Sequence, residues 1–156
     1  MTTTDSPFRF STTIEVRWRD LDALNHVNNA VYFTYLEQSR VQYVRELGLA
    51  PDAPSGIGFI VAEASCRFKS PLTLGEQVTV HIRASELRRS SFIFEYRLEG
   101  NDRRVAAEAR TAQVCYDYQN QHPIPMPDEW RDKLVEFEPG LASQAMGENR
   151  YQEAEL

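Results

Sequence analysis

Apolar and polar residues alternate along five segments of the chain, which is the pattern of strands that bury one face. In the first segment, Phe8–Trp18, apolar residues occupy even positions and charged residues lie between them. The same alternation recurs in four later segments, which are separated by turns containing proline, glycine or asparagine. The sequence therefore predicts strands over Phe8–Trp18, Ile60–Phe68, Gln77–Ala84, Ser91–Leu98 and Arg104–Tyr118.

Between the first two strands the apolar residues change to a helical period. They form one stripe that comprises Tyr32, Leu36, Tyr43 and Leu47. Asn28 or Asn29 can cap the first turn, and Gly48 suits the position just after a helix. We expect one long helix of about 20 residues, followed much later by a short helix over Pro127–Phe137.

The order of these elements indicates an α+β fold, in which one long helix is wrapped by a five-stranded antiparallel sheet. We expect residues 1–137 to form this domain, and the glutamate-rich segment Glu138–Leu156 to be a flexible acidic tail. One helix covers only one face of the sheet. The other face and the edges need a second copy of the chain to cover them, so we expect a homodimer or a dimer-of-dimers tetramer.

Composition narrows the class of protein. The chain has 156 residues and a mass of 18.0 kDa, which fits one domain. It contains neither an apolar run of the roughly 20 residues that cross a bilayer nor a secretory signal in residues 1–10. The net charge of −6 disfavours a nucleic-acid-binding protein. Cys66 and Cys115 lack metal-binding spacing, so we expect two reduced, buried thiols in a cytoplasmic protein.

The densest group of polar residues, Arg19–Asn29, lies just before the long helix. A helix N-terminus offers unpaired N–H groups and the positive end of the helix dipole, which can polarise a carbonyl group. Beside these donors, Asp22 can act as a base or a nucleophile, and His26 can orient water or substrate. The same residues also suit ordinary turn and cap hydrogen bonds. Asp20, Asp22 and His26 without a fourth ligand make a poor metal site.

This segment belongs to a longer motif with fixed spacing, made of Val16-Arg17-Trp18-Arg19-Asp20-Leu21-Asp22, His26-Val27-Asn28-Asn29, Tyr32, Tyr35, Glu37 and Arg40. The motif resembles that of hotdog-fold acyl-CoA thioesterases of the 4-hydroxybenzoyl-CoA thioesterase type, over residues 8–134. The resemblance implies a hotdog fold and hydrolysis of an acyl-CoA to a carboxylic acid and coenzyme A, with no metal or cofactor. The Ala23–His26 stretch differs from that of the 4-hydroxybenzoyl enzyme, so the acyl group stays open.

The resemblance also implies roles for three residues. Asp22 matches the catalytic carboxylate, which attacks the thioester carbonyl or activates the attacking water. The backbone N–H near Asn29 matches the donor that polarises this carbonyl. His26 matches a supporting histidine that orients Asp22, water or the acyl group.

A second polar cluster, Leu87–Phe92, lies at the predicted turn between the third and fourth strands. Arginine suits phosphate because its planar fork binds two oxygens. In the resembling family this turn lies near the nucleotide end of coenzyme A, so Arg88, Arg89 and Ser91 become candidate substrate-binding residues. A solvated, charged turn is the alternative interpretation.

Two other functions remain open at this point. One is a hotdog hydratase acting on enoyl thioesters, and the other is a non-catalytic acyl-CoA-binding hotdog protein. Among the remaining polar residues, Glu63 suits a subunit contact and His81 suits an exposed face of the sheet.

Overall fold

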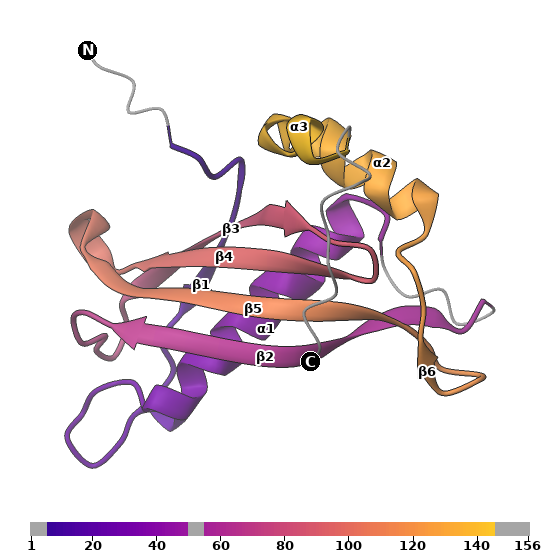
Figure 1. Ribbon diagram of the computed structural model, residues 1–156. Coiled ribbons are helices and arrows are strands. Elements are labelled where there is room, and N and C mark those ends of the chain that lie inside the picture. Colours follow the sequence, from indigo (N-terminus) through magenta and orange to yellow (C-terminus); the bar gives the residue numbers. More distant parts are fainter. Residues whose placement is uncertain (1–5, 50–54, 146–156) are drawn as a thin grey trace. The chain divides into compact units, whose positions relative to one another are not determined.

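The computed structural model describes residues 6–49 and 55–145 (Figure 1). Its elements, in chain order, are β1 (Phe10–Glu15), η1 (Trp18–Asp20), α1 (Asn29–Glu46), β2 (Ile57–Phe68), β3 (Gln77–Leu87), β4 (Ser91–Glu99), η2 (Asn101–Arg103), β5 (Val105–Asp117), β6 (His122–Pro123), α2 (Asp128–Phe137), η3 (Pro139–Leu141) and α3 (Ala142–Ala145).

The strands form one sheet in the order β1-β3-β4-β5-β2, with β6 paired to β5 (Figure 1). β1 runs antiparallel to β3, and β3, β4 and β5 follow one another through tight turns. The predicted α+β arrangement of one long helix and an antiparallel sheet is confirmed. The two-residue β6 adds a sixth strand to the five that were predicted, because His122–Pro123 is too short to show an alternating pattern.

Both ends of α1 follow from the sequence. Asn28 caps the first turn, since its side-chain oxygen accepts the N–H of Ala30 at 2.9 Å. Gly48 follows the helix with a φ of +70°, a conformation that glycine adopts without steric cost. β1, by contrast, is shorter than predicted. It ends at Glu15, and Trp18 lies in η1 with 78% of its surface exposed.

The chain divides into two compact units, each described by itself. The first contains residues up to Tyr43 together with Ser65–Arg83 and Glu95–Arg110. The second contains Val44–Ala64, Ala84–Phe94 and the chain from Thr111 onward. Among the described residues, no helix is long and apolar enough to span a membrane.

In the first unit, α1 packs on the sheet through aromatic side chains. Tyr32 meets Phe68 of β2 edge-on, with ring centroids 4.9 Å apart, and Tyr43 meets Phe10 of β1 at 5.5 Å. These tyrosines are buried, as the predicted helical stripe requires. Burying such a large side chain stabilises the fold by roughly 1.5–3 kcal/mol.

In the second unit, Phe59 of β2 contacts Phe92 of β4 and Trp130 of α2. The predicted helix over Pro127–Phe137 is therefore present and packed. Cys115 is buried and Cys66 is half-buried, and both are free thiols. Burial raises the pKa of Cys66 to about 11 and that of Cys115 to about 12, so both stay protonated near neutral pH.

The first residues of the segment that we expected to be a flexible tail are packed in the structure. Glu138 is buried and accepts the backbone N–H of Ala84 at 3.3 Å, and Leu141 is buried within η3. The ordered chain therefore continues past Glu138, because one carboxylate and one leucine anchor a segment that lacks an apolar cluster. Residues 146–156 of the expected tail lie outside the described residues, as do residues 50–54 of the Pro/Gly-rich connection.

The side chain of Glu76 links the connection before β3 to the connection between β4 and β5 in the first unit. Its carboxylate accepts the N–H of Thr73 at 2.7 Å, the N–H of Asn101 at 3.2 Å and a guanidinium N–H of Arg104 at 2.8 Å. Burial alone would raise the pKa of Glu76, but these hydrogen bonds outweigh it and hold the pKa below its ordinary value of 4.5. The ionised form of Glu76 therefore stabilises the fold.

We expect Glu76→Gln to lower the free energy of unfolding by ~1.5–3 kcal/mol at pH 7, because hydrogen bonds to a charged group are lost. The folded pKa of Glu76 is lowered, so its stabilisation is present above about pH 4.5 and lost as the pH falls further. Urea unfolding at pH 7, 4.5 and 3 should show the gap between wild type and variant closing on acidification. A gap that stays constant with pH would contradict this role.

Candidate active site

The segment between η1 and α1 is a closed loop held by backbone hydrogen bonds. The N–H of Asp22 donates to the carbonyl of His26 at 2.8 Å, and the N–H of Asn28 donates to the carbonyl of Asp20 at 2.9 Å. Leu21 and Val27 form an antiparallel bridge between these two bonds. The loop is therefore a short antiparallel hairpin that places Asp20 opposite Asn28, the residue before α1, and Asp22 opposite His26.

The two oxygens of the Asp22 carboxylate differ in their hydrogen bonds. Oδ1 accepts the backbone N–H of Leu24 at 2.8 Å and that of His26 at 3.3 Å, which is an Asx-type turn. Within the described ranges, Oδ2 has no hydrogen-bond partner. One oxygen thus fixes the orientation of the group while the other is open to a ligand.

The N-terminus of α1, which follows this loop, keeps a backbone donor without a partner among the described residues. Asn28 satisfies two of the first N–H groups, since its side chain accepts from Ala30 and its carbonyl accepts from Val31, both at 2.9 Å. The N–H of Asn29 makes no hydrogen bond within the part of the chain that the structure describes. This N–H sits at the positive end of an 18-residue helix, where developing negative charge is stabilised.

His26 lies on the same loop with an exposed side chain. Its backbone N–H contacts Asp22, but its ring makes no hydrogen bond to any described residue. The preceding Asn25 has a φ of 61°, a left-handed conformation that asparagine tolerates better than most residues. The structure therefore brings His26 to the site, with its ring free to meet a ligand rather than hydrogen-bonded to Asp22.

Beneath the loop lies a buried carboxylate with an ionic partner, a pairing that the sequence did not predict. Asp20 is 2% exposed and accepts hydrogen bonds from Arg17 and from the hydroxyl of Tyr35. Asp20 and Tyr35 belong to the motif, but their residue types and spacing did not predict a hydrogen bond between their side chains. A signal was available in principle, because a buried tyrosine on a helix requires a partner for its hydroxyl.

The second candidate cluster lies in the second unit, at the turn between β3 and β4. The N–H of Arg88 donates to the carbonyl of Ser91 at 2.8 Å and closes the turn. The side chain of Arg88 pairs with Glu86, with Nε 2.8 Å from Oε1, whereas Arg89 is exposed. Arg131 of α2 donates to the carbonyl of Arg88 at 2.7 Å, so α2 braces the turn from its backbone side.

His81 is not the exposed histidine that the sequence suggested. Its side chain is 17% exposed, and its Nε2 lies 3.2 Å from an oxygen of Glu99. The ring of Phe8 lies against it, with centroids 5.7 Å apart. The expectation failed because the chain ahead of β1 folds over this face of the sheet.

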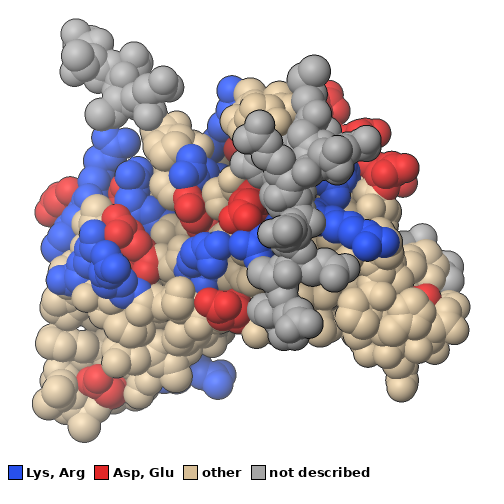
Figure 2. Space-filling view, in the orientation of Figure 1, with Lys and Arg blue, Asp and Glu red and all other residues tan. Residues whose placement is uncertain are grey.

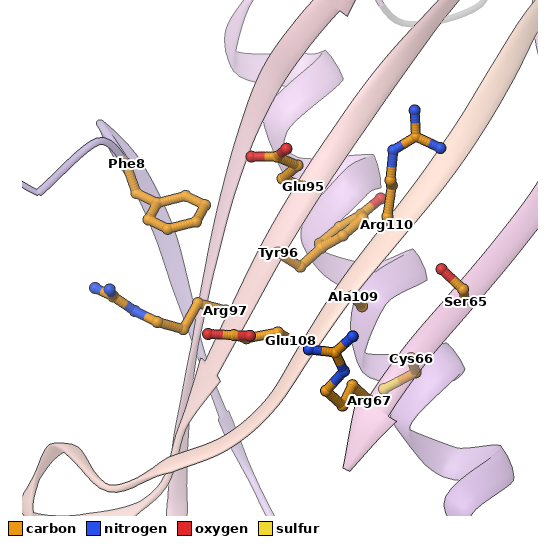
Figure 3. A pocket seen from close by; sticks show the side chains of 10 residues that line it. All are labelled: Phe8, Ser65, Cys66, Arg67, Glu95, Tyr96, Arg97, Glu108, Ala109 and Arg110. Carbon is orange, nitrogen blue, oxygen red and sulfur yellow. The ribbon is translucent and has the colours of Figure 1, made fainter. Parts of the chain in front are cut away.

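A cavity of about 700 Å³ in the first unit opens between β2, β4 and β5, with Phe8 at one side (Figure 3). Its two carboxylates are neutralised by outside cations, since Glu95 pairs with Arg83 at 2.6 Å and Glu108 with Lys69 at 2.8 Å. Figure 2 shows the same mixing of basic and acidic side chains over the face of the molecule in view. None of the residues predicted for the active site lines this cavity.

No group of three or more His, Cys, Asp or Glu side chains in residues 6–49 and 55–145 is arranged to hold a metal ion. The chemistry available at the Asp22 loop is that of a carboxylate, an imidazole and a helix N-terminus. With the antiparallel sheet and single long helix, these features define the hotdog class of thioester-acting proteins.

Comparison with known proteins gives the family. The sequence profile of the thioesterase-like superfamily matches residues 16–134, so the chain belongs to this superfamily. The long-chain acyl-CoA thioesterase FadM of Escherichia coli is 28% identical over 131 residues, which cover 81% of this chain and 97% of FadM. A thioesterase of Thermus thermophilus, solved with coenzyme A and Zn, is 32% identical with a TM-score of 0.75, covering 85% of this chain and 96% of that one.

A plant relative differs in the thioester for which it is named. The chloroplastic acyl-acyl carrier protein thioesterase ATL3 of Arabidopsis thaliana is 29% identical over 127 residues, which cover 80% of this chain. The chain spans 66% of the length of that plant protein.

Proposed function

We propose that the protein hydrolyses acyl-CoA thioesters to a carboxylic acid and free coenzyme A, and that its motif places it with the 4-hydroxybenzoyl-CoA thioesterase type. One observation carries the proposal. Two backbone N–H groups hold Oδ1 of Asp22 and leave its Oδ2 without a partner among the described residues, in the loop that leads into α1, where the N–H of Asn29 is also without a partner in the described part of the chain. A carboxylate next to a carbonyl-polarising donor is what thioester hydrolysis requires.

In this mechanism the thioester carbonyl oxygen accepts a hydrogen bond from Asn29 N–H, and the helix dipole stabilises the charge that develops there. Asp22 either removes a proton from the attacking water or attacks the carbonyl carbon to form an anhydride that water then opens. In both routes the C–S bond breaks, coenzyme A leaves as a thiolate that takes up a proton, and the acyl group leaves as its acid. His26 orients the water or the acyl group.

The turn of Arg88, Arg89 and Ser91 is our proposed contact for the phosphates of coenzyme A. Arg89 is the stronger candidate, because its side chain is exposed while that of Arg88 is paired with Glu86. An acyl-carrier-protein substrate lacks the nucleotide end of coenzyme A. This turn is therefore where a preference between the two thioesters would arise.

We further propose that a second copy of the chain pairs with β2. This strand lies at one edge of the sheet, and its residues from Ile60 to Ser65 are exposed on both faces. A long, exposed, apolar edge strand is a template for pairing with another chain. In a two-fold antiparallel pairing centred on Ser65, Glu63 would lie opposite Arg67 of the second copy, which is favourable. The two free cysteines fit a reducing compartment, so we place the protein in the cytoplasm.

Asp22→Asn is the direct test of the carboxylate. Asparagine keeps an oxygen for the N–H groups of Leu24 and His26, so the loop should hold while the charge is lost. We expect thiol release from acyl-CoA to fall by at least about 100-fold with an unchanged melting temperature. Asp132→Asn, the same change at an exposed carboxylate on α2, is the matched control. Near-wild-type turnover of Asp22→Asn would refute the assignment.

Arg88→Ala and Arg89→Ala test the nucleotide contact. We expect each to raise KM for acyl-CoA more than it lowers kcat, with the larger effect at exposed Arg89, because the phosphates are bound alike in ground and transition states. Arg9→Ala removes an exposed arginine ahead of β1 as the control. An unchanged KM in both variants would show that this turn is only solvated.

Ala64→Lys tests pairing through β2. The side chain of Ala64 is exposed in the single chain, so lysine should leave the monomer folded and disrupt pairing with a second copy. Analytical ultracentrifugation should give at least twice the chain mass of 18.0 kDa for wild type and about half the wild-type mass for the variant. Thr13→Lys on the other edge strand, β1, should keep the wild-type mass. A monomeric wild type would overturn the proposal.

A further inference from the structure

Two buried residues of the motif bond to each other through their side chains and have no role in the proposed mechanism. They are Asp20, two residues before Asp22, and Tyr35, on the second turn of α1. Both side chains are almost fully buried, with Asp20 2% exposed and Tyr35 1% exposed. A buried carboxylate is costly unless it is paired and hydrogen-bonded, so its presence beneath the loop requires an explanation.

Asp20 joins the loop to the helix at two points. Its side-chain Oδ2 accepts the hydroxyl of Tyr35 at 2.7 Å, which ties it to the body of α1. Its backbone carbonyl accepts the N–H of Asn28 at 2.9 Å, which ties it to the residue that caps α1. Asp20 therefore fixes the beginning of the loop relative to the helix N-terminus that supplies the free N–H of Asn29.

Arg17 completes the network from the end of β1. Its guanidinium donates to Oδ1 of Asp20 at 2.9 Å, and its backbone N–H donates to Oδ2 at 3.0 Å. Although burial raises the pKa of Asp20, the hydrogen bonds from Arg17 and Tyr35 hold it below the ordinary value. Burial and the bond to Asp20 raise the pKa of Tyr35, so its hydroxyl stays a donor. The bond between Asp20 and Tyr35 is therefore charge-assisted, which is the stronger kind.

We propose that Asp20 and Tyr35 are positioning residues that hold the carboxylate of Asp22 in register with the N-terminus of α1. This inference rests on the proposed thioesterase function. Asp22 is two residues beyond Asp20, and its own N–H and Oδ1 are bonded only within the loop, to His26 and Leu24. The contacts of Asp22 therefore set the shape of the loop, and the Asp20–Tyr35 bond sets where that loop sits on the helix. A displacement of about 1 Å at a reacting group can cost on the order of 100-fold in rate.

Tyr35→Phe tests this role, because it removes the hydroxyl and keeps the buried ring. We expect kcat for acyl-CoA hydrolysis to fall about 10-fold or more while KM changes less than about twofold, since a displaced carboxylate impairs the transition state and not substrate binding. Tyr96→Phe is the matched control. Tyr96 is also buried and its hydroxyl accepts a hydrogen bond from Arg40 of α1 at 3.3 Å, but it lies on β4 away from the loop. If both variants lose only thermal stability and keep wild-type kcat, the positioning role is refuted.

A double variant separates positioning from general damage. In the Asp22→Asn background, adding Tyr35→Phe should cause no further loss of kcat, because there is no longer a carboxylate to position. A second full loss of about 10-fold in that background would contradict the proposal. Asp20→Asn, which keeps the side-chain shape, provides the same readouts should Tyr35→Phe fail to fold.

Failure of this inference differs from failure of the proposed function. If wild type releases no thiol from any acyl-CoA, the function is wrong and the positioning role falls with it. If wild type is active and Asp22→Asn is inactive while Tyr35→Phe and Asp20→Asn retain wild-type kcat, the function stands and the positioning role alone is wrong.

Discussion

The hydrogen bond between the buried carboxylate of Asp20 and the hydroxyl of Tyr35 is the contact on which the proposed active site depends. It joins the chain leaving β1 to the second turn of α1, across a loop that would otherwise be attached to the helix only at its end. The charge of Asp20 is tolerated in the interior because Arg17 and Tyr35 together satisfy its two oxygens. In our proposal, the position of Asp22 follows from this anchor.

The carboxylate of Asp22 has the structural role that the sequence left open, and it has the chemical role as well in the function we propose. Its Oδ1 makes the turn hydrogen bonds expected of an aspartate in a loop, and its Oδ2 is open for chemistry. In the proposed mechanism these turn bonds hold the reactive carboxylate in one orientation, so it loses little freedom when substrate binds. The start of α1 likewise combines a bonded and an unbonded group. The side chain of Asn28 accepts the N–H of Ala30, whereas the N–H of Asn29 has no partner among the described residues.

Local patterns in the sequence were sufficient for most of the fold. Alternation predicted the long strands, and the cap at Asn28 and the glycine at position 48 marked the ends of α1, because each depends on residues close together in the chain. Contacts between distant residues were not predictable in this way. The covering of His81 by Phe8 and the anchoring of Glu138 at Ala84 depend on tertiary packing, which no periodicity records.

The sequence suggested the chemistry of the candidate site, which stays a prediction, but not the contacts beneath the loop. The motif indicated Asp22, His26 and Asn29, and the structure places Asp22 opposite His26 in the loop and Asn29 at the first position of α1. Asp20 and Tyr35 are fifteen positions apart, and only the folded helix places the tyrosine hydroxyl against the carboxylate. A buried aspartate and a buried tyrosine in one motif are the only hint of this contact that the sequence contains.

The most direct test of the account is the reaction of the unmodified protein with a panel of short, medium, long and aromatic acyl-CoAs. Free thiol and carboxylic acid should appear in equal amounts from at least one of them, at a rate proportional to protein concentration. An absorbance change of an enoyl-CoA without thiol release would instead indicate a hydratase. The absence of thiol release across the whole panel would contradict the assignment of Asp22 as a thioester-cleaving carboxylate.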